Sequence, residues 1–180
     1  IFIRGGAFHF QKKKKKELLW EAHMLISPVK VKNQKDELFD LEPQKYQLPT
    51  LENTWLDDAF DEIELMGFSL CHPFKLLKDP VKNKLTSLDL KKRIGKTVEI
   101  VGYLVNTKTT WTSSGEKMFF GTFLDSDGHW IDTVHFPPVA RSHPFTGPGS
   151  YSIIGRVIEE FDFIYIDVSY QYRLPMLSRD

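Results

Sequence analysis

The second half of the chain begins with three segments in which apolar and polar residues alternate, the pattern of half-buried β-strands. The first, residues 96–111, is rich in β-branched side chains and contains Gly102, as is typical of a strongly bent strand. Residues 117–125 and 129–136 continue the alternation, and the Asp127-Gly128 pair between them is the signal of a tight hairpin. These segments therefore predict a three-stranded meander.

The residues after the meander complete a small barrel. Residues 137–149 are rich in proline and glycine and predict at most one short helix with loops. Residues 150–161 and 162–172 alternate again as a last pair of strands. A meander, an irregular connection and a hairpin match a five-stranded Greek-key barrel of the OB type, in which we expect a core containing Val98, Ile100, Ile154 and Ile166.

The first half of the chain predicts helices on either side of a linker. Apolar residues at helical spacing follow a lysine run in residues 12–25 and return after Thr54, a suitable N-cap, until Gly67, a suitable stop. The acidic residues of this second helix spread around it, so we expect a solvated face rather than a metal site. The chain is thus mainly β with a helical N-terminal part, and we divide it into a first helical segment at 1–26, a linker at 27–53, a helical connector at 54–84 and an OB domain at 85–180.

Composition narrows the class of protein. The 180 residues include 41% apolar and 27% charged side chains, as in a globular protein, and no apolar run is long enough to cross a membrane. The single cysteine, Cys71, excludes a disulfide framework and fits a reducing cytoplasm, where we expect the protein to act. The net charge of +0 hides a basic front and an acidic middle. Because the chain begins at Ile1 rather than at Met, we expect it to be part of a longer protein.

The residues show no arrangement that would support catalysis. Asp125 and Asp127 in "DSDG" resemble a metal-binding pair, but a calcium loop needs further ligands and the hairpin explains both residues. The histidines lack the spacing of a zinc site, and there is no glycine-rich phosphate loop. We therefore expect no catalytic residue, no metal and no cofactor in these 180 residues.

Binding of single-stranded nucleic acid fits the sequence better. OB barrels bind it on the face of strands two and three, where rings stack on bases and cations contact phosphates. Met118 and Phe120 alternate with Phe119 and Phe123, so one set can fill the barrel while the other stays outside. The alternative is that these rings all belong to the core. Our candidate binding residues in this domain are Lys108, Trp111, Lys117, Phe119, Trp130, His135 and Arg141.

Three motifs in order, "RGGAFHF…ELLWE", "IELMGFSLCHPF" and "VGYLVNTKTTWTSSGEKMFFGTFLDSDGHWIDTVHFP", resemble the C-terminal region of the bacterial DNA polymerase III alpha subunit, most closely its Bacteroidetes-type versions. The resemblance implies the end of a tandem helix-hairpin-helix region, a connector helix and the OB domain. It also implies that the catalytic part, which would use Mg²⁺, lies outside these residues. Thr133 and His135 depart from the family, which more often has aliphatic residues there.

The resemblance implies that this module holds single-stranded template DNA within a replicative polymerase, a nucleotidyltransferase. It favours phosphate contacts for the lysine run at 12–16, with Lys13 and Lys14 as candidates, although a solvated run or a sorting signal is an alternative. One alternative function is an OB domain that docks on other replicase subunits through its rings. A weaker one is an anticodon-binding OB domain of a tRNA synthetase.

Overall fold

The computed structural model describes residues 1–26, 52, 54–82 and 85–178. These residues form two compact units, Ile1–Leu70 and Cys71–Ser178, which we describe one at a time. The linker that we predict at 27–53 lies outside the described residues except for Glu52. Within the part of the chain that the structure describes, no helix has both the length and the apolar character needed to cross a membrane.

The first unit contains the two helices that the sequence predicts, α1 at Lys15–Ile26 and α2 at Trp55–Met66, with a short 3-10 helix at His9–Gln11. The ends of α2 are set by local chemistry. The Thr54 hydroxyl accepts a hydrogen bond from the Asp57 amide, and the Asp57 carboxylate accepts one from the Thr54 amide, which completes a capping box. Gly67 ends the helix with φ 85°, a left-handed conformation that favours glycine. Both predicted ends of this helix are confirmed.

The acidic side chains of α2 do not form the solvated face that we predicted. They pair with the basic residues near the start of the chain: Arg4 with Asp61 and Glu64, Lys15 with Asp58 and Glu62, and Lys16 with Asp57. Glu62 is only 9% exposed and Lys15 only 7%. The prediction failed because the sequence of α2 shows how its acidic side chains are spaced around the helix. It does not show which basic side chains from the start of the chain pack against them.

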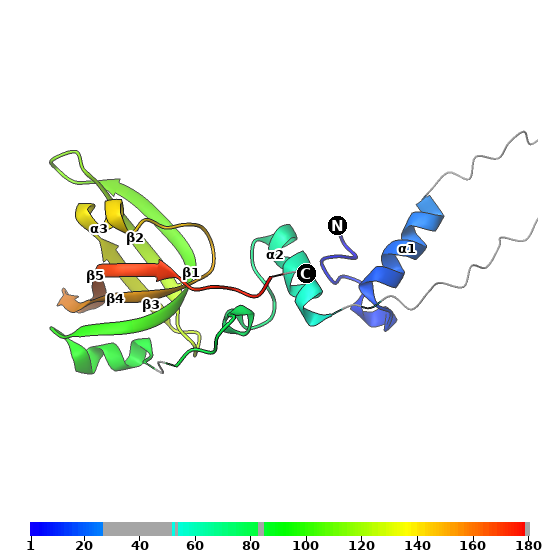
Figure 1. Cartoon of the computed structure of the whole chain (residues 1–180), viewed down its shortest axis with the longest axis horizontal. Coiled ribbons are helices and arrows are strands. Elements are labelled where there is room, and N and C mark those ends of the chain that lie inside the picture. Colours follow the sequence, from blue (N-terminus) through cyan, green and yellow to red (C-terminus); the bar gives the residue numbers. More distant parts are fainter. Residues whose placement is uncertain (27–51, 53, 83–84, 179–180) are drawn as a thin grey trace, which may run out of the picture. The chain divides into compact units, whose positions relative to one another are not determined.

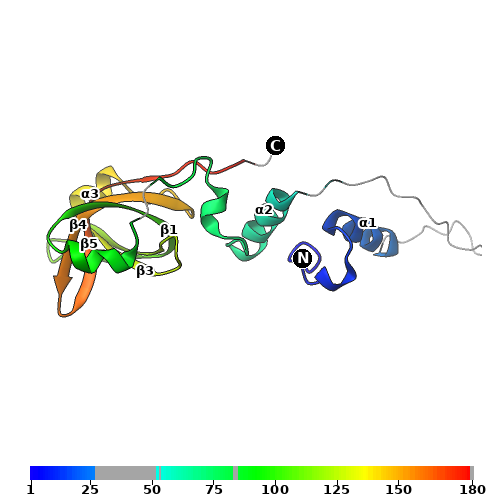
Figure 2. The same ribbon diagram turned by 90° about the horizontal axis from the view of Figure 1, so that it is seen from below.

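The second unit is a closed five-stranded barrel, seen in two orientations in Figures 1 and 2. Its strands pair in the order β1-β2-β3-β5-β4, with β3 and β5 parallel and every other pair antiparallel. A short helix, α3 at Pro137–Ser142, connects β3 to β4. This is the OB-fold barrel expected from the sequence. The strands are β1 at Thr97–Trp111, β2 at Lys117–Leu124, β3 at Trp130–His135, β4 at Ser150–Glu160 and β5 at Phe163–Arg173.

The barrel core confirms three of the four buried residues that we predicted, namely Val98, Ile100 and Ile166. Ile154 is wrong, because the inward positions of β4 are Tyr151, Ile153, Gly155 and Val157. Gly155 takes an inward position because no side chain fits there: a Cβ atom would lie 2.3 Å from the Asp167 carbonyl oxygen. With glycine at one inward site, the apolar pattern of "SIIGRV" does not reveal which isoleucine faces the core.

Two 3-10 helices, Pro73–Leu76 and Ser87–Arg93, lead into β1. The second places Leu90 in the barrel core. It is tied to the β2–β3 turn by Asp125, whose buried carboxylate accepts hydrogen bonds from the amides of Ser87, Asp127 and His129. Burial opposes ionisation of this carboxyl group, but these three donors outweigh it and lower the pKa of Asp125. The turn interpretation of "DSDG" is confirmed, with Gly128 at φ 84°.

Candidate nucleic-acid interface

The register of β1, β2 and β3 sorts the candidate residues onto two sides of the sheet. Lys108 of β1 lies opposite Phe120 of β2, which lies opposite Val134 of β3. Neighbours that are directly opposite share a face, so this row points to the outside of the barrel. Phe119 and its β3 partner His135 belong to the other set. The two sets of rings in strand two therefore have different surroundings.

The outer face carries exposed rings around a shallow cavity of about 370 Å³. Phe120 is 42% exposed, Phe136 42% and Phe163 54%. The cavity joins β2, β3 and the β4–β5 hairpin, and it is lined by Met118, Phe120, Gly121, Asp132, Thr133, Val134, Phe136, Glu160, Phe163 and Tyr165. Partly exposed rings beside a concave surface can stack on flat ligands such as bases.

Two of our candidates belong to the outer face. Lys108 is exposed and lies opposite Phe120, at one edge of the row of rings. Trp130 is 59% exposed and lies opposite Leu124, farther along the same face. Both side chains are accessible to a ligand that lies across β2 and β3.

Four other candidates gather on the opposite side of the β1–β2 hairpin, next to α3. Trp111, 65% exposed, lies opposite Lys117 at the end of the hairpin. The Lys117 ammonium lies 5.0 Å from the centre of the Phe119 ring, a cation–π distance. The Arg141 guanidinium of α3 donates to the Glu116 carboxylate at 2.9 Å. We call the group of Trp111, Lys117, Phe119 and Arg141 the hairpin side.

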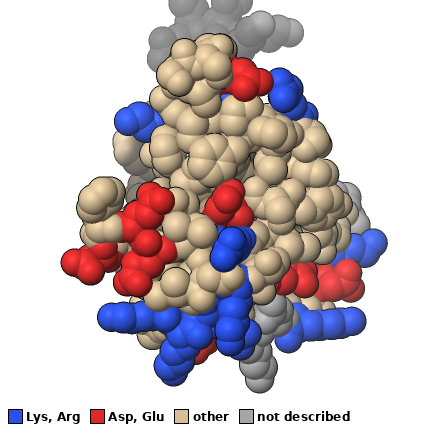
Figure 3. Space-filling view, turned by 90° about the vertical axis from the view of Figure 1, so that its left-hand side faces the viewer, with Lys and Arg blue, Asp and Glu red and all other residues tan. Residues whose placement is uncertain are grey.

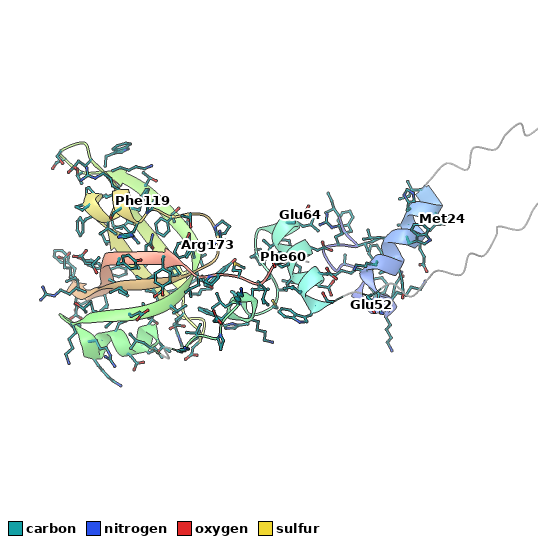
Figure 4. All side chains as sticks on the ribbon, in the orientation of Figure 1. Met24, Glu52, Phe60, Glu64, Phe119 and Arg173 are labelled. Atoms are coloured by element: carbon teal, nitrogen blue, oxygen red, sulfur yellow. The ribbon has the colours of Figure 1, made fainter. Side chains whose placement is uncertain are left out.

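Phe119, labelled in Figure 4, is only partly accessible. Its ring packs edge-on against Phe145 with centroids 5.7 Å apart. Phe123, the next ring of the same set, is fully buried and also contacts Phe145. Phe119 is thus the outermost ring of the set that fills the barrel, whereas Phe120 belongs to the exposed set.

His135 must be withdrawn from the candidates, because its side chain is 0% exposed. Its ring packs against Phe145 with centroids 4.8 Å apart, and its Nε2 lies 2.9 Å from the Thr133 hydroxyl. Desolvation lowers the pKa of His135 to about 4, so the ring is neutral at pH 7. The departure from aliphatic residues at 133 and 135 is therefore a buried polar pair and not a surface contact.

The lysine candidates of the first unit are already close to acids. The Lys13 ammonium lies 2.6 Å from the Glu21 carboxylate, and both side chains are about half exposed. The Lys14 amide donates to the Glu17 carboxylate at 3.4 Å. The proposed phosphate contacts of Lys13 and Lys14, and the helix-hairpin-helix assignment, stay predictions.

Acidic groups lie in the middle of the outer face. Asp132 accepts a hydrogen bond from the Thr122 hydroxyl at 3.0 Å, and Glu160 lines the cavity. Burial raises the pKa of Asp167, against the opposing effect of the nearby Arg156 charge. Figure 3 shows Asp and Glu side chains grouped at one side of the view, with Lys and Arg side chains along its lower edge. The centre of this face suits rings and hydrogen-bond donors better than phosphates.

The sequence analysis missed Phe136 and Phe163 as binding candidates. Both lie at an end of a segment that the sequence predicts as a strand, 129–136 for Phe136 and 162–172 for Phe163, and neither segment shows that the two rings line one cavity. Both line the cavity, which lies across the β3–β5 pair. That pairing depends on barrel closure, which local periodicity does not encode.

Comparison with known proteins adds one sequence relative. No family model matches the chain. The chain is 31% identical over 140 residues to the DNA polymerase III subunit alpha of Aquifex aeolicus, an alignment that covers 76% of this chain and 11% of that protein. The chain is thus similar to part of a DNA polymerase III subunit alpha and spans only a small share of that protein's length.

The solved structures that are weakly similar to the chain include the following two. One is a lipoprotein of Klebsiella pneumoniae described as nucleic acid-binding, with a TM-score of 0.38 and 14% identity over 48% of this chain and 76% of that chain. The other is the protein PriB of Ralstonia solanacearum, with a TM-score of 0.31 and 8% identity over 43% of this chain and 95% of that chain.

Proposed function

We propose that this chain is a nucleic-acid-binding module of a bacterial replicative DNA polymerase, the alpha subunit of DNA polymerase III, and that its barrel holds single-stranded template DNA. The observation that carries the proposal is the outer face, with Phe120, Phe136 and Phe163 partly exposed around one cavity. The sequence similarity to an alpha subunit supports the polymerase context. No polymerase chemistry is assigned to these residues, and Mg²⁺ would be bound by other parts of the parent protein.

On this face the bases would stack and the phosphates would stay at the edges. Each stacked ring contributes about 1–3 kcal/mol without selecting a particular base, as a template-holding module requires. Asp132 and Glu160 in the cavity repel phosphates but can accept hydrogen bonds from base amino groups. Lys108 at the edge of the ring row is placed for a phosphate contact.

The test compares rings on the two sides of the sheet. Phe120→Ala should weaken binding of a fluorescent single-stranded oligonucleotide by about 1–3 kcal/mol, the value of one stacked base. Phe119→Ala, on the hairpin side, should weaken it less, because that ring packs on Phe145. Phe68→Ala removes a ring that is 51% exposed in the first unit and serves as the matched control.

The pattern of losses decides where the DNA lies. If Trp111→Ala and Phe119→Ala weaken binding while Phe120→Ala does not, the DNA lies on the hairpin side, which holds four of the candidates predicted from the sequence. If the folded parent chain binds no single-stranded DNA under any salt condition, the proposed function is wrong.

A second candidate function is docking of another replicase subunit on the same face. Asp132 and Glu160 beside exposed rings favour it, since a basic, apolar protein segment would complement them. In that case the parent chain has little DNA affinity, and Phe120→Ala reduces its assembly with other replicase subunits.

A further inference from the structure

A cationic cluster lies at the end of the barrel where the chain enters β1. Lys91, Lys92, Arg93 and Lys96 are all exposed, in or just after the 3-10 helix Ser87–Arg93. Among the described residues, none of these four side chains takes part in an ion pair that would neutralise it. We call these residues, together with Arg156, the basic end.

Arg156 joins the basic end through the backbone of the turn before β1. Its Nε donates to the Gly95 carbonyl oxygen at 3.0 Å. The Gly95 amide donates to the Val157 carbonyl at 2.8 Å, and the Val157 amide donates to the Lys96 carbonyl at 3.0 Å. The turn is thus fastened to β4, which holds the cations of two distant segments on one rigid surface. The 3-10 helix Ser87–Arg93 is the green helix at the lower left of Figure 1. At the same height, in the lower part of Figure 3, Lys and Arg side chains gather.

The strand register connects the basic end to the rings. Arg156 of β4 lies opposite Asp167 of β5, and Asp167 lies opposite Val134 of β3. Val134 lies opposite Phe120, and Phe120 lies opposite Lys108. This single row runs around the outside of the barrel from Arg156 to Lys108. Four interstrand steps of about 4.8 Å give it a length of about 19 Å.

Charge is distributed along this row in a way that suits a polyanion with flat bases. Cations stand at both ends, Lys108 at one and the basic end at the other, with Phe120 and the cavity residue Val134 between them. Asp167 and Asp132 lie in the middle, where they repel phosphates. A single strand that crosses here would keep its bases on the rings and its phosphates at the ends.

We propose that the basic end, Lys91, Lys92, Arg93, Lys96 and Arg156, binds the phosphates of single-stranded DNA as it leaves the aromatic face, so that the strand runs across the β-strands from Lys108 to β4. This inference rests on the proposed function and adds a path and a second contact site to it. The partner is recognised only by its phosphates, so the site has no base preference.

The test is a salt titration of oligonucleotide binding by the whole 180-residue chain. The triple variant Lys91→Ala/Lys92→Ala/Arg93→Ala removes three cations of the basic end. Lys75→Ala/Lys78→Ala/Lys82→Ala removes three exposed lysines elsewhere in the same unit and is matched in charge. Each lost phosphate contact should reduce the log–log salt slope by about 0.7. Between about 50 and 200 mM salt, the parent should therefore lose about 20-fold more affinity than the basic-end variant if all three contacts form.

Oligonucleotide length and a charge-preserving variant sharpen the result. The effect should be strong with an oligonucleotide of about 16 nucleotides and weaker with one of about 4, the two ends of the OB site-size range, because the short one has too few phosphates to contact Lys108 and the cations of the basic end together. Lys91→Arg/Lys92→Arg keeps both charges and should bind like the parent.

The outcomes separate this inference from the proposed function. If Phe120→Ala weakens binding but the basic-end variant has the same affinity and salt slope as the charge-matched control, the basic end is not a DNA contact, although the proposed function stands. If the parent binds no single-stranded DNA, both are wrong. The path is supported if the basic-end alanine variant loses affinity while the arginine variant and the charge-matched control do not, and if this loss is larger with the longer oligonucleotide.

Discussion

The buried pair of Thr133 and His135 predicts a specific loss of stability in mild acid. The Thr133 hydroxyl donates to the Gly121 carbonyl at 2.9 Å, so its oxygen is left to accept the Nε2–H of His135 at 2.9 Å. The remaining ring nitrogen, Nδ1, is buried and has no hydrogen-bond partner among the described residues. A proton on Nδ1 would place an unsatisfied charged donor in the core, which explains why the pKa of His135 is lowered to about 4.

The sign of the effect depends on how the ring titrates in the two states. In the unfolded chain the ring takes up a proton as the pH falls below its ordinary pKa of 6.5, whereas in the folded barrel it does so only near pH 4. The stability that the neutral ring provides is therefore complete above pH 6.5 and is lost between 6.5 and 4. Linkage gives a loss of about 2 kcal/mol on going from about pH 7.5 to about pH 5, and about 3 kcal/mol at about pH 4.

Urea unfolding at about pH 7.5 and about pH 5 measures this loss. The acids of the protein also titrate, so the informative quantity is the difference between the parent and variants without the imidazole. His135→Gln and His135→Val should differ in stability at neutral pH, since they pack differently around Phe145. On going from about pH 7.5 to about pH 5, however, the free energy of unfolding of both variants should fall by about 2 kcal/mol less than that of the parent. If the parent and both variants lose the same free energy of unfolding, His135 is accessible to protons in the folded state and its burial is wrong.

Three further predictions concern a turn, the barrel and the absence of chemistry. Asp125→Ala should lower the midpoint of thermal unfolding by the equivalent of at least about 2 kcal/mol, because three backbone donors lose their acceptor. Gly155→Ala should cost about 3 kcal/mol or more in urea unfolding, since its Cβ would overlap the β5 backbone, whereas Gly5→Ala, whose Cβ would lie 3.6 Å from the Ile1 carbonyl oxygen, should be tolerated. The chain supplied with Mg²⁺, a primed template and nucleotides should extend no primer, and extension that depends on Asp125 would contradict the structural role of that residue.

The strands of the barrel could be predicted from the sequence because their signals are local. Alternation over 8 to 15 residues marks β1, β2, β4 and β5, and Asp127-Gly128 marks the hairpin between β2 and β3. Strand ends fall within about one or two residues of the predicted limits, since turn residues and prolines stand just beyond them. The topology could be predicted from the order of these elements, because few closed arrangements accommodate a meander followed by a hairpin.

The faces of the strands could not be assigned as well, because a face depends on partners elsewhere in the chain. The alternation separates Phe119 from Phe120 but does not show which of them points inward. Barrel closure decides it: Gly121 lies on the inner side because a Cβ atom there would be 2.7 Å from the Thr133 hydroxyl, and Phe119 and Phe123 share its side. Phe120 is left outside. The sequence-based candidates therefore omitted the most accessible ring of β2 and included the buried His135.

The lysines of the run at 12–16 differ in how strongly they are needed for stability, so some of them could also bind a ligand. Lys15 is 7% exposed and lies 3.0 Å from the Asp58 carboxylate, so removing its partner would leave a buried cation. Lys13 differs, because its pair with Glu21 is about half exposed on both sides and contributes at most about 1 kcal/mol. A phosphate can replace Glu21 with little loss of stability. If the first unit contacts DNA, Lys13→Ala should therefore flatten the log–log salt dependence by about 0.7 and lower stability by at most about 1 kcal/mol, whereas Lys15→Ala should lower stability more. A Lys13→Ala chain with the parent's salt slope would assign the run to the ion pairs alone.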